Sequence, residues 1–268
     1  MKKYKQAFEE LRAKNEGALI AFAVIGDPDY NTSLEITKKI VDAGANMLEL
    51  GLAFSDPIAD GPTIQKADIR ALESGINTDK ALDFVKEIRD YTKIPIGLLC
   101  YYNLVYQRGI KKFYEDSRKA GVSSILIPDM PIEESDDVIF HSKANGIDTV
   151  FMASPLTGDE RMEKIASKTT GFVYAVSRLG ITGARSIMEK SALDLVKRIK
   201  RLTDKPLCVG FGISKPEHVK DFIDAGADGA IVGSAIVGII AKNSGDKEKM
   251  LNEVYHYVRI MKLATKPL

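Results

Sequence analysis

The sequence contains few of the residues that usually bind a metal or cross-link a small protein. Only two cysteines, Cys100 and Cys208, occur among its 268 residues, and both lie inside apolar runs typical of strands. Two thiols in such places form neither a disulfide framework nor a zinc site. Histidine is also scarce, since the chain has three, His141, His218 and His256, all on segments that we predict to be helical. The sequence therefore indicates no metal centre, and acid–base chemistry would fall to carboxylates or tyrosine.

The chain also lacks an excess of charge of either sign. Lysine and arginine number 38 and aspartate and glutamate 37, which gives a formal net charge of +1. This balance gives no electrostatic reason to expect a nucleic acid or a membrane surface as partner. The N-terminal residues lead into a charged helical pattern, and neither a signal peptide nor an apolar run of transmembrane length follows. We expect a soluble, cytoplasmic protein.

The chain does contain a regular alternation of apolar runs and amphipathic segments. Hydrophobic residues make up 45% and charged residues 28%, which is ordinary for a globular protein. Eight runs predict strands, and they are nearly all apolar, which is typical of a parallel sheet covered by helices. The predicted strands are 18–25, the run around Glu49, 95–102, 124–129, 148–154, 171–177, 206–212 and 229–235. The predicted helices are 3–15, 32–44, 78–91, 109–120, 133–145, 159–168, 191–202, 215–225 and 247–263.

Eight strand–helix units in about 250 residues favour an α/β fold of the closed (β/α)8 type, the TIM barrel, over an open sheet. Helix 3–15 is then an extra N-terminal helix, and Asn31 or Thr32 is expected to cap the helix after the first strand. No linker-like segment interrupts the chain, so we expect one domain, 1–268. The longest predicted loops are 53–77 and 178–190, and long loops in a compact domain tend to be functional.

Glu49 is the first candidate for chemistry, because it is a lone carboxylate inside an apolar strand and is costly to bury. Alternation along the strand puts Leu48 and Leu50 on one face and Met47, Glu49 and Gly51 on the other. If the leucines face the helices, Glu49 faces the barrel interior near its mouth, where burial raises the pKa of a carboxyl. The alternative is a structural glutamate paired with a lysine or arginine.

Two more carboxylates follow in the loop after this strand, Asp56 and Asp60. Asp60 comes eleven residues after Glu49, in a loop long enough to fold back over the barrel mouth. The sequence Ala59-Asp60-Gly61-Pro62 is also a common turn pattern, and spacing alone favours that interpretation slightly. The same turn interpretation is stronger for Asp56, which precedes Pro57.

Glycines at the ends of neighbouring strands indicate a second site. Gly212 lies at the end of the seventh predicted strand and Gly233-Ser234 at the end of the eighth, where barrels of this class often bind phosphate through backbone N–H groups. The segment Thr182-Gly183 after the sixth strand would add further donors. The alternative is that these glycines only mark turns.

Aromatic residues near strand ends would give an apolar pocket for a flat substrate group. They are Phe22, Tyr102, Tyr174 and Phe211. The alternative is that they belong to the core.

A resemblance to a known family rests on Leu48-Glu49-Leu50-Gly51 continuing through Phe54-Ser55-Asp56-Pro57-Ile58-Ala59-Asp60-Gly61-Pro62-Thr63-Ile64-Gln65. It extends along the chain through Gly26-Asp27-Pro28, Tyr101-Tyr102-Asn103, Ile127-Pro128-Asp129, Val176-Ser177-Arg178, Gly180-Ile181-Thr182-Gly183-Ala184, Val209-Gly210-Phe211-Gly212-Ile213 and Val232-Gly233-Ser234-Ala235. On these residues the chain resembles the tryptophan synthase α subunit family. The first stretch is highly specific, whereas many phosphate-binding barrels share the glycine-rich strand ends.

The resemblance implies retro-aldol cleavage of indole-3-glycerol phosphate to indole and glyceraldehyde 3-phosphate, in tryptophan biosynthesis. By the same resemblance Glu49 would be the acid–base residue and Asp60 would accept the indole N–H, which raises Asp60 above the turn interpretation. The phosphate would be held by Gly183, Gly212, Gly233 and Ser234, and the pocket would be lined by Phe22, Ile64, Tyr102, Tyr174, Thr182 and Phe211.

The resemblance also implies a partner, a pyridoxal-phosphate β subunit in an α2β2 complex that receives indole through a tunnel. The chain itself shows no cofactor motif. It departs from the family where Ala53 replaces a usual proline, where Leu104 follows Asn103 in place of proline, and at Val24 and Ile132. Because segments 53–56 and 103–104 correspond to loops that touch the β subunit, we hypothesise weak binding of a β subunit, or binding of an unusual one.

Two rival interpretations remain open from the sequence. One is another barrel enzyme acting on a sugar phosphate, such as an indole-glycerol-phosphate synthase or a phosphate epimerase. Such enzymes would be expected to show a lysine or a His/Asp metal pair at strand ends, and we find neither. The other is a catalytically idle barrel that binds and activates a partner, which the presence of both Glu49 and Asp60 argues against.

Overall fold

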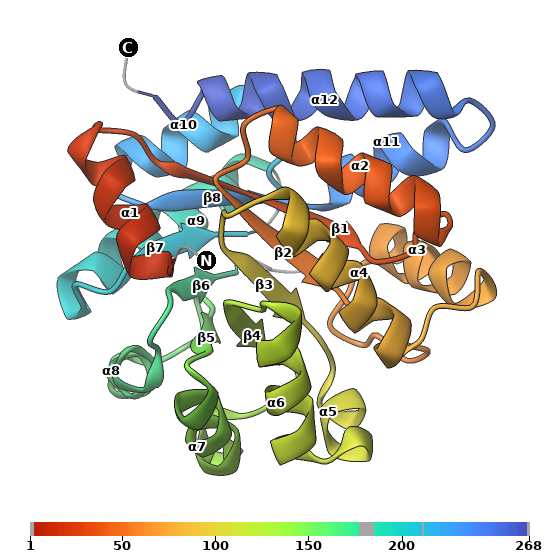
Figure 1. Ribbon diagram of the computed structural model, residues 1–268. Helices are drawn as coiled ribbons and strands as arrows, with labels where there is room; N and C mark the ends of the chain where they lie inside the picture. The colour runs from red at the N-terminus through yellow and green to blue at the C-terminus, as the bar shows by residue number, and fades with distance from the viewer. Residues whose placement is uncertain (1–2, 177–184, 211, 267–268) are drawn as a thin grey trace.

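A computed structural model describes residues 3–176, 185–210 and 212–266, without the side chains of 185–190. Eight parallel strands close into a barrel in chain order, with β8 paired to β1, and the helices surround them (Figure 1). The strands are β1 Ala18–Val24, β2 Met47–Gly51, β3 Ile96–Leu99, β4 Ser124–Leu126, β5 Asp148–Ala153, β6 Val173–Ala175, β7 Leu207–Val209 and β8 Gly229–Val232. The predicted (β/α)8 barrel is therefore confirmed.

The described helices include the predicted N-terminal one and run from α1 to α12. They are α1 Tyr4–Ala13, α2 Tyr30–Asp42, α3 Pro62–Glu73, α4 Thr78–Tyr91, α5 Tyr102–Arg108, α6 Ile110–Ala120, α7 Asp136–Asn145, α8 Asp159–Lys168, α9 Arg185–Leu202, α10 Pro216–Asp224, α11 Ser234–Lys242 and α12 Lys247–Leu263, with a short 3-10 turn, η1, at Ile132–Glu134. The three histidines lie on α7, α10 and α12, as predicted.

The two faces of the strands build two apolar clusters. Leu48 and Leu50 belong to the larger cluster between strands and helices, whereas Met47 belongs to the smaller cluster inside the barrel. Helix α1 adds Tyr4 and Phe8 to the inner cluster, so it closes the barrel end that the strands' N-termini form. The inner cluster leaves the opposite end, at the C-termini of the strands, for a cavity.

Several helix predictions were wrong in extent. Helix α3 occupies much of the segment 53–77 that we expected to be a loop, because Pro62 at the first helical turn starts a helix rather than breaking one. Helices α5 and α11 were not predicted, and α9 begins at Arg185, six residues before the predicted start. The cap of α2 is Asp29, whose carboxylate accepts the Thr32 N–H at 2.9 Å, and not Asn31 or Thr32.

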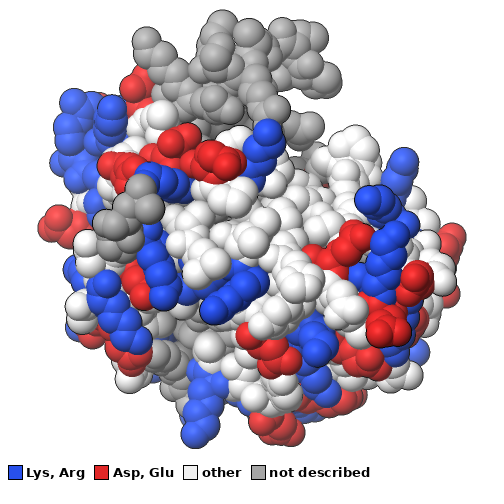
Figure 2. Space-filling model, turned by 90° about the horizontal axis from the view of Figure 1, so that it is seen from above, with Lys and Arg blue, Asp and Glu red and all other residues white. Residues whose placement is uncertain are grey.

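On the face that Figure 2 shows, basic and acidic side chains are interspersed. This pattern agrees with the near-zero net charge of the sequence. Among the described helices, none is both long and apolar enough to cross a membrane.

Candidate active site

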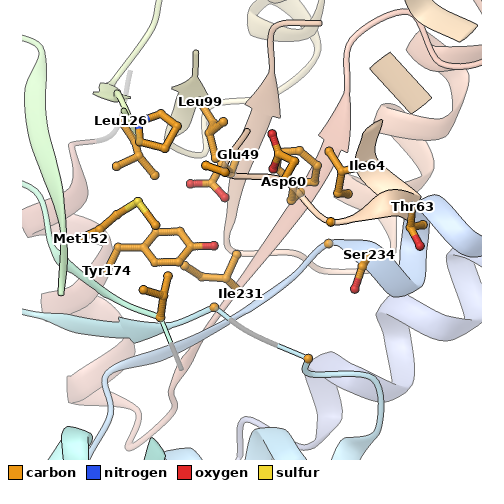
Figure 3. Close-up of a pocket in the computed structure, with 18 of the residues that line it drawn as sticks. Glu49, Asp60, Thr63, Ile64, Leu99, Leu126, Met152, Tyr174, Ile231 and Ser234 are labelled. Carbon is orange, nitrogen blue, oxygen red and sulfur yellow. The ribbon is translucent and has the colours of Figure 1, made fainter. Parts of the chain in front are cut away.

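A cavity of about 450 Å³ lies at the C-terminal ends of the strands. Its walls are Phe22, Glu49, Ala59, Asp60, Gly61, Pro62, Thr63, Ile64, Leu99, Leu126, Pro128, Met152, Tyr174, Val176, Gly210, Gly212, Ile213, Ile231, Gly233 and Ser234. Both predicted carboxylates and most of the predicted binding residues in the described part of the chain meet here (Figure 3). In barrels of this class the chemistry is found at this end.

Strand β2 carries Glu49 into the cavity. Phe22 of β1 and Gly97 of β3 are its neighbours in the sheet register, and the Glu49 side chain is only 5% exposed. Among the described residues, its Oε2 atom has no hydrogen-bond partner, and no lysine or arginine forms an ion pair with the carboxylate. The structural alternative, a glutamate held by a basic side chain, therefore finds no support among the described residues.

The environment of Glu49 favours its protonated form. Burial is the main cause, and the negative charge of Asp60 adds to it, so that the pKa of Glu49 rises from its usual value of 4.5 to about 8. Near neutral pH the carboxyl thus holds a proton that it is able to give up. A buried carboxyl that faces a cavity and has an oxygen without a partner among the described residues is a good candidate for a general acid.

Asp60 lies at the end of the loop between β2 and α3 and is held from the side by Tyr101. The Tyr101 hydroxyl donates a hydrogen bond of 2.6 Å to Asp60 Oδ2 and accepts the Ala59 N–H at 3.0 Å. The side-chain amide of Gln65 also donates to the Asp60 carbonyl at 2.9 Å. Asp60 therefore follows a turn, as its sequence indicated, and its carboxylate also lines the cavity.

Burial raises the pKa of Asp60, and the hydrogen bond from Tyr101 opposes that rise. Asp56 has a different setting, because it is exposed and its carboxylate accepts a hydrogen bond from the neighbouring Ser55 hydroxyl at 2.5 Å. Of the two loop carboxylates, therefore, only that of Asp60 lines the cavity and is a candidate for chemistry.

One end of the cavity is apolar. Figure 3 shows Leu99, Leu126, Met152, Tyr174 and Ile231 grouped on one side of Glu49, with Asp60 on the other side. Leu99, Leu126, Met152 and Ile231 were not predicted as site residues, because apolar strand residues are usually core and nothing in the sequence distinguishes them. This end fits a flat apolar group whose edge reaches the two carboxylates.

The other end of the cavity is formed by glycines and a helix terminus. Gly233 precedes α11, which begins at Ser234, so the unpaired N–H groups of the first helical turn lie at the cavity wall. Gly212 also lines the wall and has a φ of +61°, which glycine adopts at no cost. A helix N-terminus beside glycines is a ready anion site and needs no lysine or arginine.

Gly210 shows why small residues are needed at the strand ends. A Cβ built on Gly210 would lie 2.2 Å from the Tyr174 hydroxyl oxygen and 2.4 Å from its Cζ. Tyr174 is 9% exposed and lines the cavity, so a larger residue at 210 would push its ring into that space.

The remaining predicted binding residues divide into three groups. Phe22 and Ile64 line the cavity. Tyr102 begins α5, where its N–H donates to Asp129 Oδ1 at 2.9 Å, and it is not among the described residues that line the cavity. Thr182, Gly183 and Phe211 lie outside the described residues, so their roles stay predictions.

Tyr101, the residue beside Tyr102, contacts Asp60 instead. Its ring is buried, and it stacks on the Phe54 ring with centroids 5.1 Å apart. The sequence places two tyrosines after β3 and contains no signal that tells which one turns toward the loop. Tyr101 is therefore a site residue that we did not predict.

Comparisons with known proteins agree with this geometry. A family model described as tryptophan synthase alpha chain matches residues 8–266. A tryptophan synthase alpha chain of Methanothermobacter thermautotrophicus is 47% identical over 259 residues, 96% of either chain. Solved tryptophan synthase of Mycobacterium tuberculosis has a TM-score of 0.90 at 30% identity and covers 99% of this chain and 98% of that one. The tryptophan synthase complex of Pyrococcus furiosus has a TM-score of 0.83 at 40% identity and covers 91% and 98%. The chain therefore belongs to the tryptophan synthase alpha chain family.

Proposed function

We propose that this chain is a carbon–carbon lyase that cleaves indole-3-glycerol phosphate to indole and glyceraldehyde 3-phosphate. The observation that carries the proposal is the Glu49 carboxyl, which is buried, has no partner for Oε2 among the described residues, and lies between the two unlike ends of one cavity. The substrate has the same division, with an apolar ring at one end and a phosphate at the other.

The substrate fits the cavity in one direction. The indole ring takes the apolar end beside Leu126 and Met152, and the phosphate takes the end formed by Gly212, Gly233 and Ser234. Thr182, Gly183 and Phe211 complete these contacts in the proposal. The bond that breaks, between indole C3 and the first glycerol carbon, then lies near Glu49.

Glu49 moves the proton in the proposed reaction. Its carboxyl gives a proton to indole C3, the bond from C3 to the glycerol carbon breaks, and the bonding electrons return to the ring. The glycerol hydroxyl becomes the aldehyde and loses its proton, which the Glu49 carboxylate takes up. The carboxyl is thereby restored. Because the pKa of Glu49 is raised to about 8, the side chain is able both to give and to take up a proton near neutral pH.

Asp60 stabilises charge on the ring in this scheme. Protonation at C3 leaves a positive charge on the indole nitrogen, and an ionised Asp60 that accepts the indole N–H stabilises that charge in a desolvated site. The hydrogen bond from Tyr101 favours the ionised form of Asp60 and fixes its direction.

Separation of the products by chromatography offers a direct test, because the substrate contains the same indole ring as the product and must be resolved from it. The purified chain is incubated with indole-3-glycerol phosphate, and indole and triose phosphate are measured together. We expect equal amounts of the two products. A chain that releases neither product, alone or with a β subunit, would contradict the proposal.

We further propose that the chain pairs with a pyridoxal-phosphate β subunit, as the solved tryptophan synthase complexes suggest. Exposed apolar residues stand on loops or helices that follow strand ends, with Ile58 81%, Tyr106 65% and Leu156 82% exposed. We propose that these residues take part in the interface, since a contiguous apolar patch on a protein surface marks a partner. Ala53 and Leu104 stand where the family usually has proline. Ala53 is buried and Leu104 is half-buried, so we expect them to affect binding of the β subunit indirectly, through the conformation of the segments 53–56 and 103–104.

Gel filtration of the chain mixed with a β subunit at micromolar concentration tests the hypothesis of altered pairing. Weak pairing predicts that the two subunits elute separately or as a broad, concentration-dependent peak. A single sharp α2β2 peak would reject that hypothesis and leave the proposed reaction untouched.

A further inference from the structure

Helix α3 holds the main chain of Asp60. The side-chain amide of Gln65, on the first turn of α3, donates a hydrogen bond of 2.9 Å to the Asp60 carbonyl. Thr63 and Ile64 of the same turn line the cavity. The place of Asp60 in the cavity therefore depends on where α3 lies on the barrel.

An ion pair fixes the other half of α3 to the turn after β1. Arg70 donates from Nε to Asp27 Oδ1 at 2.7 Å and from Nη2 to Asp27 Oδ2 at 2.9 Å. The Asp27 side chain is fully buried, and the Arg70 side chain is 26% exposed. Just beyond α3, Ile76 packs so closely on Gly26 that a Cβ at position 26 would collide with it. Neither Asp27 nor Arg70 is among the described residues that line the cavity, and no step of the proposed reaction uses them.

Stability alone does not explain this ion pair. Removing two charges from water costs about as much as their attraction returns, so apolar residues of the same size would often stabilise a fold equally well. Two parallel hydrogen bonds between a planar guanidinium and a carboxylate instead fix an orientation as well as a distance. Arg70 and Gln65 lie on one helix about 7.5 Å apart along its axis, from a rise of about 1.5 Å per residue. An orientation fixed at Arg70 is thereby carried to Gln65.

We propose that Asp27 and Arg70 are positioning residues: their ion pair fixes the orientation of α3, and α3 holds Asp60 in place through Gln65. The expected effect on the rate of cleavage rests on the proposed function. Because Asp60 meets a positive charge that exists only after indole C3 is protonated, a displaced Asp60 should lower kcat much more than it changes KM.

Two single variants and their combination test this path. Arg70→Lys keeps the positive charge beside Asp27 but replaces the planar two-bond contact by a single ammonium. Gln65→Met keeps the length of the side chain and removes the amide that binds the Asp60 carbonyl. We expect each to lower kcat about tenfold with KM within about twofold of the wild type, since a small misplacement of a catalytic group costs about one to two orders of magnitude. The double variant should lose about tenfold in total, because both substitutions interrupt one path.

Arg108→Lys is the matched control. Arg108, the last residue of α5, donates from Nε and Nη2 to Asp116 Oδ2 at 2.9 and 2.7 Å, and its side chain is 17% exposed. The same substitution therefore disturbs an ion pair of the same kind, at a residue that is not among the described ones lining the cavity. We expect urea unfolding to show a similar loss of stability in both arginine variants, and kcat to fall only in Arg70→Lys. All rates are measured with a β subunit at saturating concentration, so that altered pairing does not limit them.

Nuclear magnetic resonance gives a readout that does not depend on activity. Arg70→Lys should shift the signals of the Gln65 side-chain amide and of the Asp60 backbone amide, which donates to the Pro57 carbonyl at 3.0 Å. Arg108→Lys should leave both signals in place. Unchanged signals in Arg70→Lys would overturn the proposal, and so would a double variant whose losses multiply to about a hundredfold. If the wild type releases no indole, the proposed function fails, and the signals still decide whether the ion pair positions Asp60.

Discussion

The variant Glu49→Gln is expected to release indole at least about three orders of magnitude more slowly than the wild type, a loss of about 4 kcal/mol in transition-state stabilisation. Glutamine fills the same space in β2 but has no proton to give to indole C3 and no carboxylate to take the hydroxyl proton. Because Oε2 of Glu49 has no hydrogen-bond partner in the part of the chain that the structure describes, the substitution breaks no hydrogen bond between that oxygen and those residues. The measurement is the initial rate of indole release at saturating substrate, beside the wild type.

The folding stability of Glu49→Gln is the control for this loss. The pKa of Glu49 is about 8 in the folded chain against 4.5 ordinarily, so the folded state binds a proton that the unfolded state has lost. Between pH 4.5 and about pH 8, the titration of Glu49 should therefore lower the free energy of unfolding of the wild type by about 1.4 kcal/mol for each unit of pH. Glutamine does not titrate, so the free energy of unfolding of Glu49→Gln should not fall in this way. At pH 7 it should exceed that of the wild type by about 3 kcal/mol. An inactive variant that is also less stable would point to misfolding instead of lost chemistry.

The variant Asp60→Asn is expected to lower kcat by about two orders of magnitude or more, because it removes the negative charge that faces the indole nitrogen. Asparagine keeps an oxygen that accepts the hydrogen bond from Tyr101, so the loop should stay in place. The rates are best compared with a β subunit at saturating concentration, so that closure of the loop does not limit either enzyme.

Asp56→Asn is the matched control for Asp60→Asn. It makes the same chemical change four residues earlier, at an exposed position whose carboxylate has one hydrogen-bond partner among the described residues, the Ser55 hydroxyl. We expect Asp56→Asn to keep the wild-type rate. Equal losses in the two variants would mean that the loop, and not the Asp60 carboxylate, determines the rate.

The barrel was predictable because its signal is repeated eight times. Each strand is a continuous apolar run, which is what a sheet buried on both faces requires, and an error at one boundary leaves the count unchanged. The helices that we missed carry weaker signals. Helix α3 starts at Pro62, which also reads as a breaker, and α11 follows β8 with a single glycine, Gly233, between them.

The site was predictable only in part, for a physical reason. Glu49 is visible in the sequence because a charge inside an apolar strand needs an explanation. The role of Asp60 came from the resemblance to a family, since its local pattern also fits an ordinary turn. The role of Tyr101 depends on which way side chains at the end of β3 turn in the folded barrel, and no local pattern contains that information.

The central claim is that Glu49 moves the proton in the cleavage of indole-3-glycerol phosphate, and one measurement tests it most directly. Indole release by the wild type and by Glu49→Gln is followed under the same conditions, each with a β subunit present. We predict clear release by the wild type and a rate at least about a thousandfold lower in the variant. Equal rates would show that Glu49 is not the acid–base residue, and no release from either would contradict the proposed reaction itself.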